Sequence, residues 1–463
     1  MNTTYRDFLK SKHLRVAATG FEVSDSNINQ KLHPWQRDIT RWAVRRGRAE
    51  LWEDCGLGKT PQQLEWARLV SEHTKGQVLI LCPLAVARQT EREAAKFSIQ
   101  ASVSIAQEQS QAKTQIVITN YERLHLFDPS RFSGVVLDES SILKAFMGAT
   151  KQQLVSAFAN TPYKLGCSAT PAPNDRKELG NHSEFLGIMP SNEMLARWFI
   201  NNSMKCGGYV LRPYAAKDFW RWVSSWAVCI GRPSDIGYSD EGYDLPPLRI
   251  HEHVVEGQRE AGCLFNRGKQ VSATDVHREK RSCLPERADV VASLINADNE
   301  AWAVWCDTDY EADALTDRMP EAVEVRGSHP TKTKEDRLEG FANGKIRVMV
   351  TKSEVGGFGL NWQHAHKTTW FAGYSYERWY QAIRRLWRYG QTQAVDCHLV
   401  LSSNEQSIKT IVDRKAKQHT EMQTEMSMLM REGMLENLYE HRGLTEYMPT
   451  QQIKIPSWLA RRV

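Results

Sequence analysis

Short, continuous apolar runs rich in β-branched residues alternate with helical patterns along this chain. The runs of the first half are QVLILCP (77–83), QIVITN (115–120), GVVLDES (134–140) and YKLGCSAT (163–170). Those of the second half are AWAVWC (301–306), AVEVRG (322–327), IRVMVT (346–351), KTTWFAG (367–373) and VDCHLVL (395–401). Apolar runs of this length suit strands that are buried on both faces of a parallel sheet. Because helical patterns such as 331–344 lie between them, the chain predicts βαβ units and an α/β fold.

The two groups of runs are separated by 175–300, a segment too long for a simple loop. Its first part is aromatic and predicts helices, and the paired prolines of 239–249 are typical of a linker. We therefore predict two lobes, each a mainly parallel sheet flanked by helices, with a partly helical insertion and linker between them. The expected division is 1–235 for the first lobe with its insertion after about 175, 236–300 for the linker and the start of lobe two, 301–403 for the second lobe, and 404–463 for a C-terminal helical extension.

Composition narrows the class of protein. Of the 463 residues, 41% are hydrophobic and 25% are charged, which is ordinary for a globular protein. We expect a cytoplasmic protein, because the sequence has no apolar run long enough to span a membrane and no apolar leader at its N-terminus. Nine cysteines are scattered singly, which favours reduced thiols over disulfides or zinc ribbons. The net charge of +5 permits a polyanionic partner without demanding one.

The segment CGLGKT (55–60) has the residue types of a phosphate cradle. Gly56 and Gly58 lack Cβ atoms, so backbone N–H groups there can wrap a phosphate. Lys59 would reach the β- and γ-phosphates, and the Thr60 hydroxyl would ligate Mg²⁺. The strict pattern requires glycine at position 53, where this chain has Glu53. Taken alone, the segment is equally well interpreted as a glycine-rich turn with an exposed lysine.

An acidic pair strengthens the prediction of a nucleotide site. Asp138 and Glu139 end the run GVVLDE, at the carboxyl edge of a predicted parallel strand where such sheets bind ligands. Asp138 could hold Mg²⁺ through water, and Glu139 could polarise the water that attacks the γ-phosphate. A solvent-facing acidic pair is common by itself. The cradle and the acidic pair in this order predict nucleotide hydrolysis.

The second half supplies two arginines. In YQAIRRLWRYGQ (380–391), Arg385 and Arg388 are three positions apart and would share one face of a helix. Directed at a γ-phosphate, both would act as arginine fingers from the other lobe, so that catalysis requires closure of the cleft. The alternative is a basic helix face that binds no ligand or a nucleic-acid backbone.

These motifs resemble those of superfamily 2 helicase-type motors, and most closely the SWI2/SNF2 group of double-stranded DNA translocases. LHPWQRDI (32–39) is similar to the adenine-reading Q motif and DCGLGKTPQ (54–62) to motif I. VVLDESSILK (135–144) occupies motif II, GCSATPAPN (166–174) motif III, VGGFGLNWQHA (355–365) motif V, and QAIRRLWRYGQ (381–391) motif VI. The resemblance implies two RecA-like lobes with ATP and Mg²⁺ in the cleft. The ATP-binding residues implied are Gln36, Cys55, Gly56, Leu57, Gly58, Lys59, Thr60 and Gly357.

Two positions depart from the family pattern. Motif II usually reads D-E-A-H or D-E-G-H, whereas this chain has Ser140 and Ser141 after the acidic pair. The missing histidine normally links the ATP site to motif III, and Ser141 could make a hydrogen bond in its place. Arg384 stands where the family usually has glycine. The residues expected to couple hydrolysis to motion are Ser141, Ser168, Ala169 and Thr170.

The resemblance also implies a groove that grips a nucleic-acid backbone without reading bases. The candidate contacts are Pro83, Asn120, Tyr121, Arg326, Gly327 and Ser353. The tryptophans of the insertion either stack on bases or pack it against the first lobe, and we favour packing; they are Trp220, Trp222 and Trp226. The methionines near the C-terminus are likewise expected to pack against a core or a lobe rather than to hold a cofactor.

The leading hypothesis is an ATP-dependent translocase or helicase that couples ATP hydrolysis between two lobes to movement on duplex or branched DNA. One alternative is a strand-separating helicase that acts on forks, R-loops or RNA. Another is a nucleotide-dependent switch that recruits partners with slow turnover. The compact chain, which lacks large added domains, resembles the small motors of bacteriophages and prophages more than eukaryotic remodellers, and would then act in the host cytoplasm. We expect a monomer.

Overall fold

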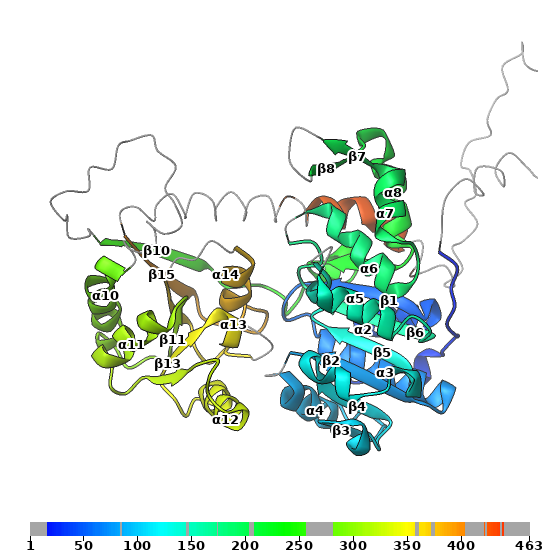
Figure 1. Ribbon diagram of the computed structural model, residues 1–463. Coiled ribbons are helices and arrows are strands. Elements are labelled where there is room, and N and C mark those ends of the chain that lie inside the picture. Colours follow the sequence, from blue (N-terminus) through cyan, green and yellow to red (C-terminus); the bar gives the residue numbers. More distant parts are fainter. Residues whose placement is uncertain are drawn as a thin grey trace, which may run out of the picture.

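The computed structural model describes two lobes, each built on one sheet whose strands all run parallel (Figure 1). The described residues are 16–83, 86–144, 148–173, 175–202, 208–255, 281–356, 361–371, 376–402, 421, 424–435 and 438. The predicted α/β fold with two RecA-like lobes is confirmed, as is the partly helical insertion between them.

The first lobe contains a seven-stranded sheet in the order β3-β4-β2-β5-β6-β1-β9. Its strands are β1 (Arg48–Glu53), β2 (Gln77–Cys82), β3 (Val103–Ile105), β4 (Ile116–Asn120), β5 (Phe132–Asp138), β6 (Tyr163–Ser168) and β9 (Ala227–Ile230). The accompanying helices include α2 (Pro34–Arg46), α3 (Lys59–Thr74), α4 (Ala87–Lys96) and α5 (Ala149–Ala157). Four strands fall on the predicted apolar runs. The sequence RAELWE gives no such run, yet β1 lies between β6 and β9 with Glu50 and Glu53 fully buried.

The insertion forms α6 (Leu179–Leu186), α7 (Ser191–Trp198), an antiparallel hairpin of β7 (Phe199–Asn202) and β8 (Gly208–Leu211), and α8 (Ala216–Ser224). Trp220, Trp222 and Trp226 are at most 1% exposed and belong to the core of the first lobe. The Trp226 ring meets the rings of Trp222 and Trp52 edge to face, and the Trp220 ring meets Phe219 in the same way. The packing interpretation is therefore confirmed, and base stacking by these tryptophans is wrong because the rings have no accessible face.

The second lobe contains a six-stranded sheet in the order β10-β15-β14-β11-β13-β12. Its strands are β10 (Leu248–Val255), β11 (Trp302–Cys306), β12 (Val323–Val325), β13 (Val348–Lys352), β14 (Lys367–Phe371) and β15 (Val395–Ser402). Its helices are α10 (Leu284–Asn296), α11 (Asp309–Arg318), α12 (Thr331–Ala342), α13 (Ser353–Gly356) and α14 (Tyr376–Ile383). Alternate residues of β11 enter two apolar clusters, one on each face of the sheet. Helices therefore cover both faces, which explains the unbroken apolar runs.

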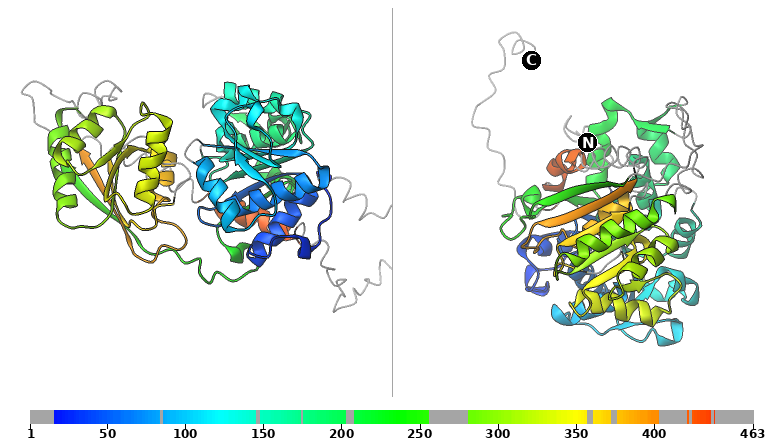
Figure 2. Two further views of the ribbon diagram at one scale, coloured as in Figure 1. Left: turned by 90° about the horizontal axis from the view of Figure 1, so that it is seen from below. Right: turned by 90° about the vertical axis from the view of Figure 1, so that its left-hand side faces the viewer.

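The described part of the C-terminal segment returns to the first lobe, as Figure 2 shows for the red segment. Met426, Met430 and Met434 are at most 2% exposed and lie in the first lobe's core. The Cys229 N–H donates to the Met434 sulfur at 3.2 Å. The prediction that these methionines pack is confirmed. Because β15 ends in the second lobe, the chain connects the two lobes twice.

The described residues include no helix with the length and apolar character needed to cross a membrane.

Candidate active site

The phosphate cradle is the loop between the end of β1 and the start of α3. Gly56 and Gly58 have φ values of 93° and 82°, a left-handed conformation that side chains disfavour. A Cβ atom on Gly58 would lie 2.4 Å from the Gln36 amide nitrogen. That amide donates to the Leu57 carbonyl at 2.8 Å, and its oxygen accepts from the His33 N–H. Gln36 therefore supports the cradle from behind, and its reading of adenine stays a prediction.

Lys59 lies across the cradle and closes it with hydrogen bonds. Its ammonium donates to the carbonyl oxygens of Glu53 at 2.6 Å and of Asp54 at 3.1 Å. Glu53 is the last residue of β1, and Asp54 is the first residue of the loop. A bound triphosphate, with a larger negative charge than two carbonyl dipoles, would compete for this ammonium. The carbonyl contacts keep Lys59 satisfied while holding it close to where the phosphates would bind.

Glu139 joins the second and third motifs. It follows β5 with a φ of 65°, a strained conformation for a residue with a side chain and one that often occurs at functional sites. One carboxylate oxygen accepts from the Ser141 hydroxyl at 2.8 Å and from the Ser168 hydroxyl at 2.7 Å. The Thr170 N–H donates to the same Ser168 hydroxyl at 3.0 Å. Two serines thus fix the orientation of the carboxylate that the sequence nominated as the hydrolytic base.

Asp138 and Thr60 line one cavity and could hold Mg²⁺. Burial raises the pKa of Asp138 to about 6; the negative charge of Glu139 adds to this effect, and the positive charge of Lys59 opposes it. A divalent cation would favour the ionised form. Among the described residues, no group of three or more histidine, cysteine or acidic side chains could bind a metal. A site with two protein oxygen ligands fits Mg²⁺, which usually completes its shell with water and phosphate oxygens.

A buried polar network behind motif II has no counterpart in the sequence analysis. The Ser140 hydroxyl donates to the Glu50 carboxylate at 2.9 Å. His182 lies 3.1 Å from the other Glu50 oxygen, and its second ring nitrogen lies 2.9 Å from the Pro171 carbonyl. Burial lowers the pKa of His182, but the charge of Glu50 and the hydrogen bonds to Glu50 and Pro171 outweigh it and raise the pKa. The network connects motif II to motif III through a helix of the insertion. Its only signal in the sequence is the acidic Glu50 among apolar neighbours.

The second lobe closes the same cavity of about 290 Å³ with Arg385 and Arg388. The predicted helix is wrong here: α14 ends at Ile383, and both arginines lie in tight turns stabilised by bonds such as Arg385 N–H to the Ala382 carbonyl at 3.1 Å. The turns still bring both guanidiniums to the cavity. Burial lowers the pKa of Arg385 to about 10 and also lowers that of Arg388. The buried Arg385 and the partly buried Arg388 line the cavity together with Lys59 and create a site that a polyanion would neutralise.

Three lining residues of the second lobe were missed by sequence reasoning, namely Asn361, Gln363 and Tyr389. Tyr389 lies directly against the cradle. A Cβ atom added to Gly56 would be only 3.1 Å from the backbone nitrogen of Tyr389. Its hydroxyl donates to the Gly231 carbonyl of the first lobe at 2.6 Å. The Asn361 amide donates to Gln363 at 2.7 Å. Polar and aromatic residues of this kind are too common in loops to be singled out without the cavity.

Residues 35–206 match the family model of the SNF2-related domain. Over these residues the first lobe is therefore similar to SNF2-related domains. The chain is also similar to a solved structure, the SWI2/SNF2 ATPase core of Sulfolobus solfataricus in complex with double-stranded DNA. That similarity has 18% identity and a TM-score of 0.41, and it covers 90% of this chain and 99% of the other. No curated protein matches the sequence.

The residues of the first lobe that the sequence nominated for DNA contact lie around its strand ends. Among these DNA-contact nominees, Pro83 lines the cavity. The Tyr121 hydroxyl donates to the Asp138 carbonyl at 2.8 Å, and the Asn120 side chain accepts from the Arg123 N–H at 3.1 Å. These contacts support the acidic pair and the start of the following turn. Contact with DNA stays a prediction for all of them.

Of the nominees in the second lobe, Arg326 forms ion pairs with Asp313 and Glu324. The Gly327 carbonyl accepts from the Lys334 ammonium at 3.1 Å, and Ser353, at 8% exposure, begins α13. Their role in binding DNA stays a prediction. Gly357, nominated for ATP, lies outside the described residues.

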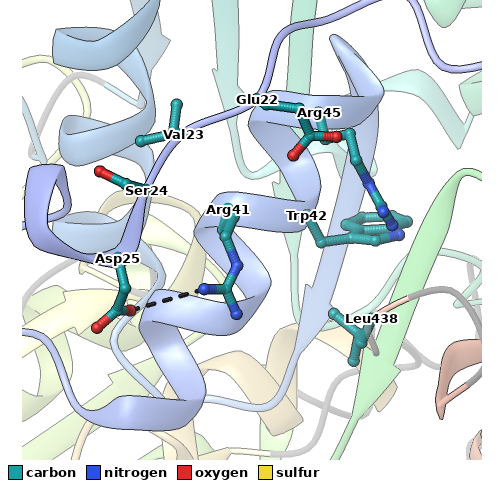
Figure 3. A pocket seen from close by; sticks show the side chains of 8 residues that line it. All are labelled: Glu22, Val23, Ser24, Asp25, Arg41, Trp42, Arg45 and Leu438. Carbon is teal, nitrogen blue, oxygen red and sulfur yellow. Dashed lines mark ion pairs between the residues drawn. The ribbon is translucent and has the colours of Figure 1, made fainter. Parts of the chain in front are cut away.

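A second cavity of about 410 Å³ lies on the first lobe, where the segment before α2 meets α2 and Leu438 (Figure 3). Arg41 points to Asp25, with 3.8 Å between the charged atoms, and also pairs with Asp38. Because the charge of Arg41 is balanced by these carboxylates, we assign this cavity no part in nucleotide binding.

Proposed function

We propose that this chain is an ATP-driven DNA translocase that hydrolyses ATP between its two lobes and converts lobe movement into movement along duplex DNA. The observation that supports hydrolysis is the cavity shared by both lobes. Lys59, Thr60, Asp138 and Glu139 line it from the first lobe, and Arg385 and Arg388 from the second. This is the combination of cradle, acidic pair and arginines that transfer of a γ-phosphoryl group to water requires.

In this mechanism the Lys59 ammonium leaves the loop carbonyls and binds the β- and γ-phosphates. Mg²⁺, held by Thr60 and Asp138, would neutralise charge on the phosphate oxygens. Glu139 orients the attacking water and accepts its proton, with its carboxylate held by Ser141 and Ser168. Arg385 and Arg388 stabilise the charge that develops on the transferred group.

DNA is proposed as the track because residues 35–206 match the SNF2-related domain and the motifs of the second half follow in the order that SNF2-like motors have. The net charge of +5 is compatible with this partner. Backbone contacts along a groove would leave translocation largely independent of sequence.

The test is the rate of ATP hydrolysis by the full chain with no nucleic acid, with single strands, with duplex, with forks and with RNA. Strong stimulation by duplex is the expected result. Stimulation only by single strands or RNA would instead support a strand-separating or RNA-directed helicase, and slow turnover with no stimulation would support a binding switch.

Lys59→Ala should abolish hydrolysis, and a Lys59→Ala protein with wild-type turnover would refute the site. Glu139→Gln should bind ATP without cleaving it.

A further inference from the structure

Asp54, at the entrance of the phosphate cradle, is bound by two side chains of the second lobe. The Arg384 guanidinium lies 2.6 Å from one carboxylate oxygen and donates to the Cys55 carbonyl at 3.0 Å. The Tyr380 hydroxyl donates to the other carboxylate oxygen at 2.7 Å. The Cys55 N–H also donates a hydrogen bond to that second oxygen, at 2.6 Å. The second lobe therefore contacts both the side chain and the backbone of the loop that would hold phosphate.

This ion pair is buried between the lobes. The side chain of Arg384 is 1% exposed and that of Asp54 is 13% exposed. The guanidinium lies 5.2–5.8 Å from the ring centres of Tyr380, Trp387 and Tyr389. A buried guanidinium is unfavourable unless an anion accompanies it, so separation of the lobes would leave both charges without their partner. Burial lowers the pKa of Arg384, but the charge of Asp54 and the nearby Tyr380, Cys55 and Tyr389 together outweigh this effect and raise the pKa.

Arg384 immediately precedes Arg385 in the turns that follow α14. The position of its guanidinium on Asp54 therefore constrains where the next residues of the turn lie. Each lobe has its own apolar core, and this pair belongs to neither. A glycine at position 384, as the resembled family usually has, could not make the contact.

We propose that Arg384 is a positioning residue whose ion pair with Asp54 docks the second lobe on the phosphate cradle and directs Arg385 and Arg388 at the phosphates. The proposal deepens the proposed function and, for its effect on turnover, rests on it. Arg384 itself does not touch the nucleotide. Its contribution is to hold the second lobe against the cradle, so that residues of both lobes form one site.

The first experiment compares turnover in Arg384→Gln, Asp54→Asn and the double variant. We expect each single variant to lower kcat by about 10²-fold, the loss typical of displaced catalytic groups. The affinity for a fluorescent ATP analogue should change far less, because Lys59 and the cradle remain. The double variant should be no worse than either single one, since both remove the same contact. Multiplicative losses, or an unchanged kcat, would overturn the proposal.

The second experiment needs no hydrolysis. Small-angle X-ray scattering without nucleotide should give a larger radius of gyration for Arg384→Gln than for the wild type. The matched control is Arg378→Gln, which removes an arginine of α14 that is 46% exposed and pairs with Asp307 and Glu354 inside the second lobe. The control should scatter like the wild type. Equal scattering by wild type and Arg384→Gln would refute docking of the second lobe by this ion pair. This result would stand even if the wild type hydrolysed no ATP and the proposed function failed.

Circular dichroism and thermal unfolding identify a variant that does not fold. Tyr380→Phe then provides the gentler test, because it removes one hydroxyl contact to Asp54 and keeps the ring. Tyr380→Phe should lower kcat and increase the radius of gyration, each by less than Arg384→Gln does. A folded Tyr380→Phe protein that matches the wild type in both measurements would count against the proposal.

Discussion

At the scale of the residue, Glu53 stands where a strict phosphate-binding loop has glycine. It is the last residue of β1, and its carboxylate accepts from the Gln62 amide at 2.8 Å. Its carbonyl accepts from Lys59. The left-handed turns lie at Gly56 and Gly58, so the strand can end in an acid without disturbing the cradle. The departure from the strict motif is therefore compatible with the loop geometry.

Glu53 should also make stability depend on pH. Burial raises its pKa from 4.5 to about 7, although the charge of Lys59 and the Gln62 hydrogen bond oppose this. The folded protein then holds the proton more tightly than the unfolded chain, so stability is lost as pH rises from about 4.5 to about 7. Glu53→Gln should abolish that loss, with a gain in the free energy of unfolding of up to about 3 kcal/mol above pH 7.

Urea unfolding of wild type and Glu53→Gln between pH 4 and about 8 measures this gain. The exposed Glu241→Gln is the control and should show no such pH-dependent difference. A difference between Glu53→Gln and wild type that stays constant across the range would contradict the buried, raised-pKa carboxyl.

At the scale of the element, the turns after α14 bring Arg385 and Arg388 to the cavity. A continued helix would place Arg385 and Arg388 one above the other along its axis. In the structure the chain instead closes into turns that end at Gly390, whose φ of 92° permits the return toward β15. A Cβ on this glycine would lie 2.8 Å from the Gln363 amide. The path of this short segment decides which side chains reach the cavity.

Arg385→Ala tests the role of this element. Removal of an arginine finger typically lowers kcat by about 10³–10⁵-fold, and we expect a loss in that range with little change in ATP affinity. Single-turnover hydrolysis and equilibrium binding of ATP measure the two quantities separately. Arg378→Ala, on α14 but away from the cavity, is the matched control. If Arg385→Ala hydrolyses ATP normally and only binds DNA more weakly, the finger assignment is wrong.

At the scale of the whole molecule, two kinds of ion pair join the lobes. The Arg384–Asp54 pair is buried at the cleft. On the surface, Arg88 of α4 lies 2.8 Å from Glu335 of α12, and Arg92 pairs with Glu339. Arg88 and Arg92 are 42% and 52% exposed, so their pairs are each worth roughly 0–1 kcal/mol and are screened by salt. The two kinds of contact should therefore respond differently to ionic strength.

Arg92→Glu should increase the radius of gyration at low salt, because it places two negative charges side by side. Arg92→Glu combined with Glu339→Arg should restore the wild-type value. Both effects should vanish near 1 M salt, where the Debye length is about 3 Å, whereas the expansion of Arg384→Gln should persist. Scattering at low and high salt measures the contrast. An Arg92→Glu effect that is insensitive to salt would show that α4 and α12 are not held by these exposed pairs.

Much of the fold could be predicted because it is encoded in local patterns. Strands such as β2 and β5 are continuous apolar runs, which is the composition that strands buried on both faces of a parallel sheet need. The internal strand β1 and the edge strand β10 escaped prediction because their sequences, RAELWE and LRIHEHVV, mix charged and apolar residues. Glu50 in β1 is tolerated in the core only because Ser140, Trp52 and His182 surround its carboxylate. Such partners come from distant parts of the chain.

The sequence by itself identified the candidate chemical groups of this protein. Lys59, Thr60, Asp138 and Glu139 were evident because phosphate cradles and strand-end acids require particular residues within a few positions of one another. Only the tertiary structure decided how these groups meet the second lobe, because contacts such as Arg384 with Asp54 join residues 330 positions apart in the chain. A charged residue in a sequence shows neither its burial nor its partner. Folding decides both. In this protein Arg384, which departs from the family motif, forms a contact between the lobes.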